Sequence, residues 1–426
     1  MATEYGGNTY NKYGQPSLDL VFTGPKKSLK NRVGNQQVEF TRDTIGTYID
    51  ENGIIKTAVA DEARFEKEGL LIEESRANIY KYSNLMNPTN GSTPSNFTAN
   101  AGTAPDGTNT AFKLVQKPSS DGVVLQGQSF SIGAKDGPLA VFSVFAKAGE
   151  DRYLYITPYL SVSLTPPVFD LQTGTISNPD NHAAVMRPLA NGWYRCSLRV
   201  RRGGFASMRW GISNVADAPF ANNGVQFEGD GTSGLLVWGA QYELQTPNAV
   251  NGDSPITIEA SSVIPTTGSA ITRAADVCTI TGDNFSSWYN QSEGTVVTKI
   301  TDNGEPARVI FHLGRGQGNG DNRIITTTGA NYGAYVETAA TQVNMPGGWY
   351  TKGVETVGAF AFKQDNFALA TDGVIRGTDN SGDLPTCDRL YLFMNRNASD
   401  TITGHISRIT YYPRRLSNAE LQTITL

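Results

Sequence analysis

Two stretches near the middle of the chain decide its organisation: GLLVWGAQYEL, residues Gly234–Leu244, and VIPTTGSAITRAAD, residues Val263–Asp276. The first alternates apolar and polar side chains around Trp238, which is the pattern of a strand with one face in a sandwich core. The second is rich in small residues, with one proline, Pro265, and one arginine, Arg273, as is typical of a linker. We therefore expect a seam between two β-sandwiches, with Pro265 and Arg273 setting their orientation rather than contacting a ligand.

The composition favours many short strands. The chain has 426 residues, of which 45 are Gly and 20 are Pro, and only 18% are charged. Tight turns use glycine and proline, whereas long surface helices need more Glu, Lys and Ala. A chain of this length forms two or three domains. We predict an all-β protein with two β-sandwich domains, of the jelly-roll or concanavalin-like type, in tandem after a small β-rich N-terminal region.

The spacing of turn residues predicts the domain boundaries. Residues 1–84 are expected to form an N-terminal tail and attachment region, in which Asn52-Gly53 marks a hairpin turn. Residues 85–262 are predicted to form the first sandwich, residues 263–284 the linker and residues 285–426 the second sandwich.

Three motifs in the N-terminal region resemble structural proteins of tailed bacteriophages. They are Thr41-Arg42, the hairpin sequence Tyr48–Gly53 and the strand sequence Gly69–Asn78. The seam described above is similar to the junction between two sandwiches in the same proteins. This resemblance implies a virion-associated protein and does not imply a particular ligand.

Further motifs resemble the sandwich domains of these proteins. Phe169–Thr175 and Asn191–Ser197 are similar to their carbohydrate-module-like sandwich. Gly404–Leu421, an aromatic strand followed by Leu-Ser-x-Ala-Glu-Leu, is similar to the end of concanavalin A-like and laminin-G-like sandwiches. Within it, Ser417 is expected to cap a final helical turn.

The resemblance implies a fibre, spike or decoration protein of the virion, assembled in the host cytoplasm. Its N-terminal region would bind other virion proteins of the capsid or tail, and its sandwiches would project and bind host-surface polysaccharide. Such proteins are usually homotrimers, and because no heptad stalk is present, trimer contacts are expected on sandwich faces or the N-terminal region. The alternatives are a purely structural capsid-decoration or tail protein without sugar binding and, third, a polysaccharide depolymerase.

Aromatic rings are the expected glycan-binding surface, because sugar C–H groups stack on flat rings. Trp288 with Tyr289, and Trp349 with Tyr350, flank turns and are the candidate ligand-binding residues. The other tryptophans lie in alternating strands and are expected in the core: Trp193, Trp210 and Trp238.

The sequence argues against catalysis. Only three histidines are present, and neither a Gly-x-Ser-x-Gly nucleophile elbow nor a His-Glu-x-x-His zinc motif occurs. His405 lies in a β-run beside Ile406, where a structural role is favoured. The nearest approach to paired carboxylates, Glu228–Gly231, is typical of a turn. We predict that the protein is no enzyme and has no catalytic residues.

Calcium is the cation that sandwiches of this type most often bind, and three loops offer oxygen ligands: Thr301–Glu305, Gly320–Asn322 and Asp379–Asp383. None has the EF-hand pattern, and Asn, Asp and Gly are also ordinary turn residues. We therefore expect no metal and no other cofactor.

Charge and cysteine usage limit the partners. The net charge of −5 offers no general field for nucleic acid, and the short basic cluster Lys26–Arg32 is typical of a solvated loop. Cys196, Cys278 and Cys387 are far apart in sequence, which predicts buried free thiols in a reducing compartment. No apolar run is long enough for a signal peptide or a membrane span, so we expect no membrane insertion.

Overall fold

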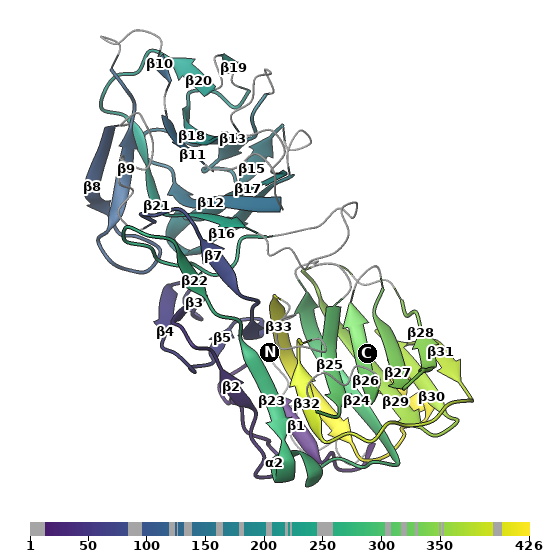
Figure 1. The fold of residues 1–426 in the computed structure, drawn as a ribbon. Helices are drawn as coiled ribbons and strands as arrows, with labels where there is room; N and C mark the ends of the chain where they lie inside the picture. Colours follow the sequence, from purple (N-terminus) through teal and green to yellow (C-terminus); the bar gives the residue numbers. More distant parts are fainter. Residues whose placement is uncertain are drawn as a thin grey trace.

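The computed structural model confirms an all-β protein built from antiparallel sheets (Figure 1). The strands form two β-sandwiches, joined by segments that cross between them. The structure describes residues 13–83, 96–118, 124–125, 127–131, 139–158, 165–178, 183–201, 207–217, 220–221, 224–244, 259–302, 308–316, 322–328, 331–348, 351, 353–394 and 403–426.

The first sandwich packs two sheets around a core that includes Phe142, Trp210 and Leu235. A small third sheet lies at its far end (Figure 1). In spatial order the larger sheet contains β16 (Ala183–Pro188), β17 (Tyr194–Arg201), β12 (Leu139–Lys147), β21 (Gly234–Leu244), β7 (Arg76–Asn78) and β22 (Ile271–Arg273), with β9 (Ala111–Val115) and β8 (Asn96–Gly102) beside the first half of β21. The facing sheet contains β11 (Gly127–Ser131), β18 (Ser207–Ser213), β13 (Tyr153–Pro158), β14 (Val168–Asp170) and β15 (Thr175–Ser177), and the small sheet β10 (Val124–Leu125), β20 (Gly224–Phe227) and β19 (Phe220–Ala221).

The second sandwich also packs two sheets, around a core that includes Phe311, Phe360 and Tyr411. One sheet contains β31 (Val374–Asp379), β30 (Phe367–Thr371), β29 (Glu355–Lys363), β24 (Glu293–Asp302), β33 (Gly404–Tyr412), β6 (Gly69–Ile72) and β5 (Arg64–Glu66), with β1 (Leu18–Val21) also beside β33. The other contains β2 (Glu39–Thr41), β23 (Val277–Thr281), β32 (Arg389–Leu392), β25 (Arg308–Gly314), β26 (Asn322–Thr328), β27 (Gly333–Thr338) and β28 (Thr341–Met345).

Short local elements follow the turn and capping signals of the sequence. β3 (Gly46–Ile49) and β4 (Ile55–Ala58) form the expected hairpin, and Gly53 in its turn has φ of 75°, which favours glycine. Ser417 precedes helix α3 (Asn418–Ile424) as the expected N-cap and forms a capping box with Glu420. Helix α2 (Gly282–Ser286) precedes β24.

The N-terminal region differs from the separate unit that we expected in residues 1–84. β1, β5 and β6 pair with β33 or with each other, and β2 pairs with β23, so these strands complete the second sandwich. β7 instead pairs with β21 of the first sandwich. The physical reason is burial: Leu18, Leu20, Leu70 and Ile72 are fully buried and supply part of the second core.

The expected linker, residues 263–284, also differs from a free connection. β22 pairs with β7 and so extends the first sandwich, whereas β23 belongs to the second. Between these two strands the chain passes from one sandwich to the other. The Pro/Thr/Ser composition of this segment correctly indicated a junction but gave no sign of the two strands within it.

A bulge in β21 explains how one strand serves two cores. Its register with β12 shifts between Ser143 and Phe145, opposite Gly239, which has φ of 60°. Leu235 and Val237 face the first core, but Trp238 packs in a separate apolar cluster with Phe145 and Ile55 of the hairpin. Trp238 therefore links the first sandwich to the β3–β4 hairpin.

Five buried charged residues connect the two sandwiches, and we call them the seam cluster: Arg42, Arg64, Glu73, Arg273 and Asp276. Arg42 Nη1 donates to Asp276 Oδ1 at 3.1 Å, and Arg64 donates to both Glu73 and Asp276. Arg273 Nη2 donates to the Glu74 carbonyl oxygen at 2.7 Å and its Nε lies 3.5 Å from Glu73. Four of the five come from the motifs that suggested the phage resemblance, and Arg64 lies between two of those motifs. That Arg273 sets the orientation of the sandwiches stays a prediction.

The environment of Glu73 shows how the seam cluster tolerates burial. Burial by itself raises the pKa of the Glu73 carboxyl, because a charge is disfavoured away from water. The guanidinium groups of Arg273 and Arg64 and hydrogen bonds from Ser262 outweigh this effect and hold the pKa well below its usual range. Glu73 is therefore ionised in the folded protein and depends on its partners.

Glu73→Gln should destabilise the protein by about 3–5 kcal/mol at pH 7, because it leaves two buried guanidinium groups short of a counter-charge. The folded-state pKa of Glu73 lies below its unfolded value, so its contribution is complete above that unfolded pKa and decreases as the pH falls below about 4.5. Denaturant unfolding at several pH values measures both effects.

The matched control is Glu51→Gln, the same change on the exposed turn of the hairpin. It should alter the free energy of unfolding by less than about 0.5 kcal/mol. If the stability difference between the wild type and the Glu73→Gln variant stays constant from pH 7 to about pH 3, the ionised state assigned to Glu73 is contradicted.

Candidate functional site

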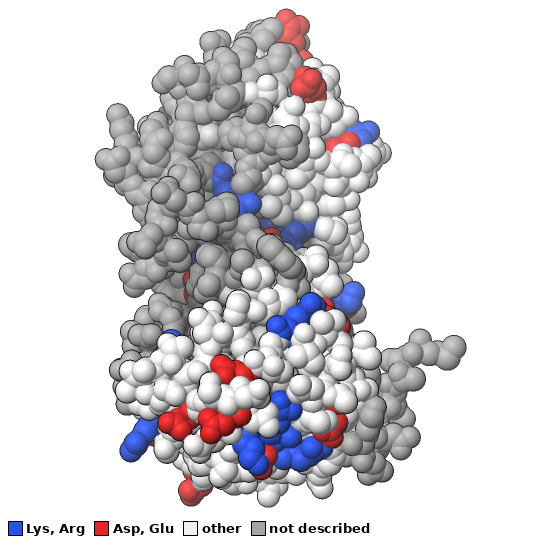
Figure 2. All heavy atoms as spheres, turned by 90° about the vertical axis from the view of Figure 1, so that its right-hand side faces the viewer, with Lys and Arg blue, Asp and Glu red and all other residues white. Residues whose placement is uncertain are grey.

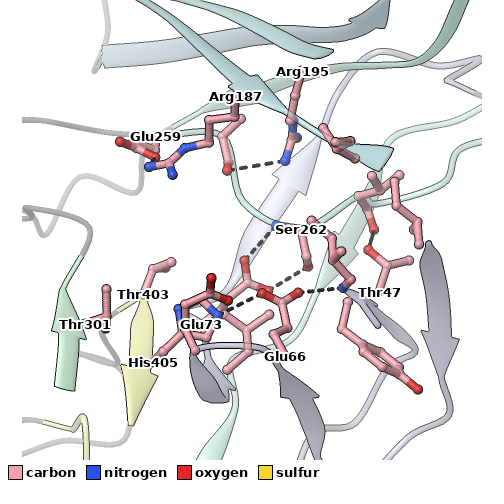
Figure 3. A pocket seen from close by; sticks show the side chains of 18 of the residues that line it. Thr47, Glu66, Glu73, Arg187, Arg195, Glu259, Ser262, Thr301, Thr403 and His405 are labelled. Atoms are coloured by element: carbon pink, nitrogen blue, oxygen red, sulfur yellow. Dashed lines mark hydrogen bonds and ion pairs between the residues drawn. The ribbon is translucent and has the colours of Figure 1, made fainter. Parts of the chain in front are cut away.

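A cavity of about 420 Å³ lies where the two sandwiches meet (Figure 3). Its lining combines polar and charged residues with apolar ones. The polar and charged lining residues are Thr47, Tyr48, Glu66, Glu68, Glu73, Arg187, Arg195, Glu259, Ser262, Thr301, Thr403 and His405. The apolar lining residues and one glycine are Ile49, Ile55, Leu71, Phe145, Pro188, Leu189, Ala260, Val263 and Gly353. This is the mixture of surfaces that small-molecule sites use.

Two arginines from the first sandwich form one side of the cavity. Arg195 of β17 is firmly held: it donates to the Ser261 carbonyl oxygen at 2.5 Å and to Ser143 Oγ at 3.0 Å, above the Phe145 ring. Arg187 of β16 pairs with Glu259, but its side chain is 51% exposed. Arg187 is therefore the cation of this wall that can turn toward a ligand.

The opposite side is acidic and comes from the second sandwich. Glu66 of β5 accepts a hydrogen bond from the backbone N–H of Ile49 at 2.6 Å through Oε1, and its Oε2 lies 2.8 Å from Nε2 of His405. Glu68 follows in the turn between β5 and β6. Figure 3 shows Glu66 and His405 facing the arginines across the cavity.

The structure places two predicted glycan-binding rings inside the protein. Trp288 is 3% exposed and Tyr289 is 9% exposed, and both belong to the core of the second sandwich. The Trp288 ring lies 4.9 Å from Tyr411 and 5.0 Å from Phe285 between centroids. Burial also raises the pKa of the Tyr289 hydroxyl well above its usual value. In this structure the two rings pack against neighbours and present no open face to a sugar, so a sugar-stacking role for them is not supported.

The structure tests some of the other residues singled out in the sequence and leaves the rest outside the described residues. Trp349 and Tyr350 lie outside the described residues, as does most of the loops Thr301–Glu305 and Gly320–Asn322. In the third loop, Asp379 Oδ1 accepts hydrogen bonds from the backbone N–H and hydroxyl of Ser381, as in an ordinary turn. The core positions are confirmed for the other tryptophans and the burial for the three free cysteines: Trp193, Trp210, Trp238, Cys196, Cys278 and Cys387.

The cavity residues were not identified by sequence reasoning. The hairpin, β5, β16, the segment after residue 258 and β33 all contribute, so the lining comes from parts of the chain between Thr47 and His405. The available signal was the pair of glutamates Glu66 and Glu68 next to Gly69, at the edge of a motif that we interpreted only as a strand. His405 was expected to be structural, but it faces a carboxylate at the cavity.

The surface charge agrees with the mixed composition of the chain. On the face shown in Figure 2, acidic and basic side chains of the described residues lie interspersed, so that face has no extended field of one sign. Within the part of the chain that the structure describes, no helix is long and apolar enough to cross a membrane.

Comparison with known proteins gives structural similarity without a family. No protein-family model and no curated protein matches the chain. One similar solved structure is the CBM40 of the Ruminococcus gnavus IT-sialidase bound to α2,3-sialyllactose, with 16% identity and a TM-score of 0.30 over 34% of this chain and 88% of that one. A second is the NanB sialidase of Streptococcus pneumoniae, with 16% identity and a TM-score of 0.30 over 35% and 26% of the two chains. A third is the receptor-binding domain of botulinum neurotoxin mosaic serotype C/D, with 11% identity and a TM-score of 0.28 over 35% and 39%.

Trp288→Ala should destabilise the second sandwich by about 3–5 kcal/mol, because it removes a large ring from a packed core. Trp288→Phe should destabilise the second sandwich much less, because it keeps an aromatic ring in the core. It also removes no hydrogen bond, since among the described residues the Trp288 indole N–H has no partner. Denaturant unfolding of both variants checks the ranking. A fully stable Trp288→Ala protein would mean that this ring is not a core residue.

Proposed function

We propose that the chain is a non-enzymatic, glycan-binding structural protein of a bacteriophage virion, of the fibre, spike or decoration type. The cavity between the two sandwiches is its ligand site. The observation that carries the ligand part of the proposal is the cavity itself, whose lining contains both hydrogen-bonding and apolar side chains. Saccharides need both surfaces, because each sugar ring has hydroxyl groups at its rim and C–H groups on its faces.

The charges of the cavity define the kind of glycan. Four glutamates and two arginines line it. Glu73 is neutralised by Arg64 and Arg273, Arg187 is already paired with Glu259, and Arg195 lies 4.0 Å from Glu243. The remaining excess is acidic, at Glu66 and Glu68, and an acidic ligand would be repelled there. A neutral oligosaccharide is therefore the proposed ligand.

The virion part of the proposal is supported by sequence motifs, not by similar structures. The motifs Thr41-Arg42, Gly69–Asn78 and Val263–Asp276, which resemble phage structural proteins, supply every residue of the seam cluster except Arg64. Such a protein would attach to capsid or tail proteins through its N-terminal region and act as a homotrimer, gaining avidity from many copies of a weak site. Since residues 18–78 are part of both sandwiches, attachment there would orient both of them on the particle.

A glycan array of neutral and acidic oligosaccharides tests the ligand site. The wild type should bind neutral glycans reproducibly, and Arg187→Ala should weaken that binding roughly tenfold to a hundredfold, because a charged hydrogen-bond donor is lost. Arg152→Ala is the matched control: Arg152 is likewise a partly exposed arginine of the first sandwich, paired with Asp170 outside the cavity. It should leave binding unchanged.

Other results of the array have definite meanings. Silence of the folded wild type would favour a purely structural virion protein. Binding that Arg187→Ala leaves intact would place the site elsewhere. Release of oligosaccharides from a bound polysaccharide would overturn the non-enzymatic assignment and favour a depolymerase.

Mass spectrometry and electron microscopy of purified particles test the virion assignment. The protein should be found in the particles in multiples of three copies, and density for both sandwiches should project from the capsid or tail. The assignment fails if particles from infected cells contain none of the protein while it accumulates in the soluble fraction.

A further inference from the structure

Three side chains with metal-binding atoms meet on the acidic side of the cavity. One ligand atom each from Glu66, Glu68 and His405 lies within 4.8 Å of the other two. The Glu66 carboxylate is already oriented, because Oε1 accepts the Ile49 N–H and Oε2 is left facing His405. A backbone hydrogen bond of this kind holds a carboxylate in place for an ion.

The backbone forces these side chains together. Glu66 ends β5 and pairs with Gly69 at the start of β6, so Glu68 lies in the tight turn between them. Gly69 has φ of 133°, and a Cβ there would lie 2.1 Å from the carbonyl oxygen of Ile406. Only glycine lets the hairpin approach β33 this closely, and that approach sets its two carboxylates beside His405.

His405 has an unused nitrogen. The residue is 8% exposed, and its Nδ1 is buried without a hydrogen-bond partner among the described residues. In the tautomer with its proton on Nδ1, the Nε2 lone pair points at the Glu66 carboxylate and can bind a cation in place of the hydrogen bond between Nε2 and Oε2. Neutral imidazole with a free lone pair is a common metal ligand.

Among the described residues, neither carboxylate has a Lys or Arg ion-pair partner. Arg64, on the same strand as Glu66, directs its guanidinium to Glu73 and Asp276, and Arg187 pairs with Glu259. His405 is the ion-pair partner that the structure shows for Glu66, and it is charged only when protonated. A divalent cation would neutralise both glutamates in a partly buried place.

We propose that Glu66, Glu68 and His405 bind a divalent transition-metal ion, for which Zn²⁺ is the best match. Zn²⁺ takes imidazole nitrogen and carboxylate oxygen at about 2.0–2.2 Å, and the ion would replace the hydrogen bond between Glu66 and His405. Its remaining coordination positions would open into the cavity. The site extends beyond the proposed function, whose charge argument concerns the metal-free cavity, since it can hold an ion whether or not the cavity binds a saccharide.

Titration of the full chain with zinc chloride in a calorimeter, and with Co²⁺ followed by visible absorption, tests the proposal. The wild type should bind one equivalent of Zn²⁺, and bound Co²⁺ should show the d–d bands of an ion with nitrogen and oxygen ligands. Glu66→Gln and Glu68→Gln should each weaken zinc binding at least about tenfold. Glu51→Gln, the same change on the exposed hairpin turn, should have no effect.

Glu68 is exposed, so the Glu68→Gln variant will fold, and a loss of zinc binding in it reports on the site rather than on misfolding. The proposal is overturned if the wild type shows no saturable one-to-one binding up to about 1 mM zinc, or if Glu68→Gln binds as tightly as wild type. Neither result depends on the glycan array, because zinc alone is the probe.

Discussion

A charge removed from water must be paired, and this requirement determines how the two sandwiches are joined at the seam cluster. Arg42, Arg64 and Arg273 can be buried only where the carboxylates of Glu73 and Asp276 pair with them. The three segments that carry these five residues are therefore held in one arrangement relative to one another. Arg64 lies on the same strand and the same face as Glu66. The cluster that joins the sandwiches therefore also sets the acidic side of the cavity. Glu73 belongs to this cluster and also lines the cavity.

Local signals in the sequence were sufficient for the fold class and for several details. Alternation around Trp238, the Asn52-Gly53 turn and the Ser417 cap each act within a few residues, so the sequence alone predicts them. Strand partners depend on distant residues. The sequence around Leu18 and Leu20 predicts a strand of a separate N-terminal region, yet this strand pairs with β33. No residue near them in the chain indicates that pairing.

The candidate site was less predictable than the fold. Aromatic residues that flank turns were reasonable candidates for stacking on a sugar. Whether such a ring is exposed depends on the residues that pack over it, and Phe285 and Tyr411 pack against Trp288. The cavity arises only after both sandwiches are in place. Glu66, Arg187 and His405 therefore carry no common local pattern that could have revealed them.

The order of strands along the chain has a consequence for synthesis. β1, β5 and β6 are made long before their neighbour β33, so Leu18 cannot pair with Tyr411 until the intervening chain has been made. The first sandwich is inserted between these parts, and most of its strands are complete before the second sandwich can close. Domains fold as units while the chain grows. The first sandwich can thus fold on the nascent chain before β33 is made, and the second sandwich closes only once β33 is available.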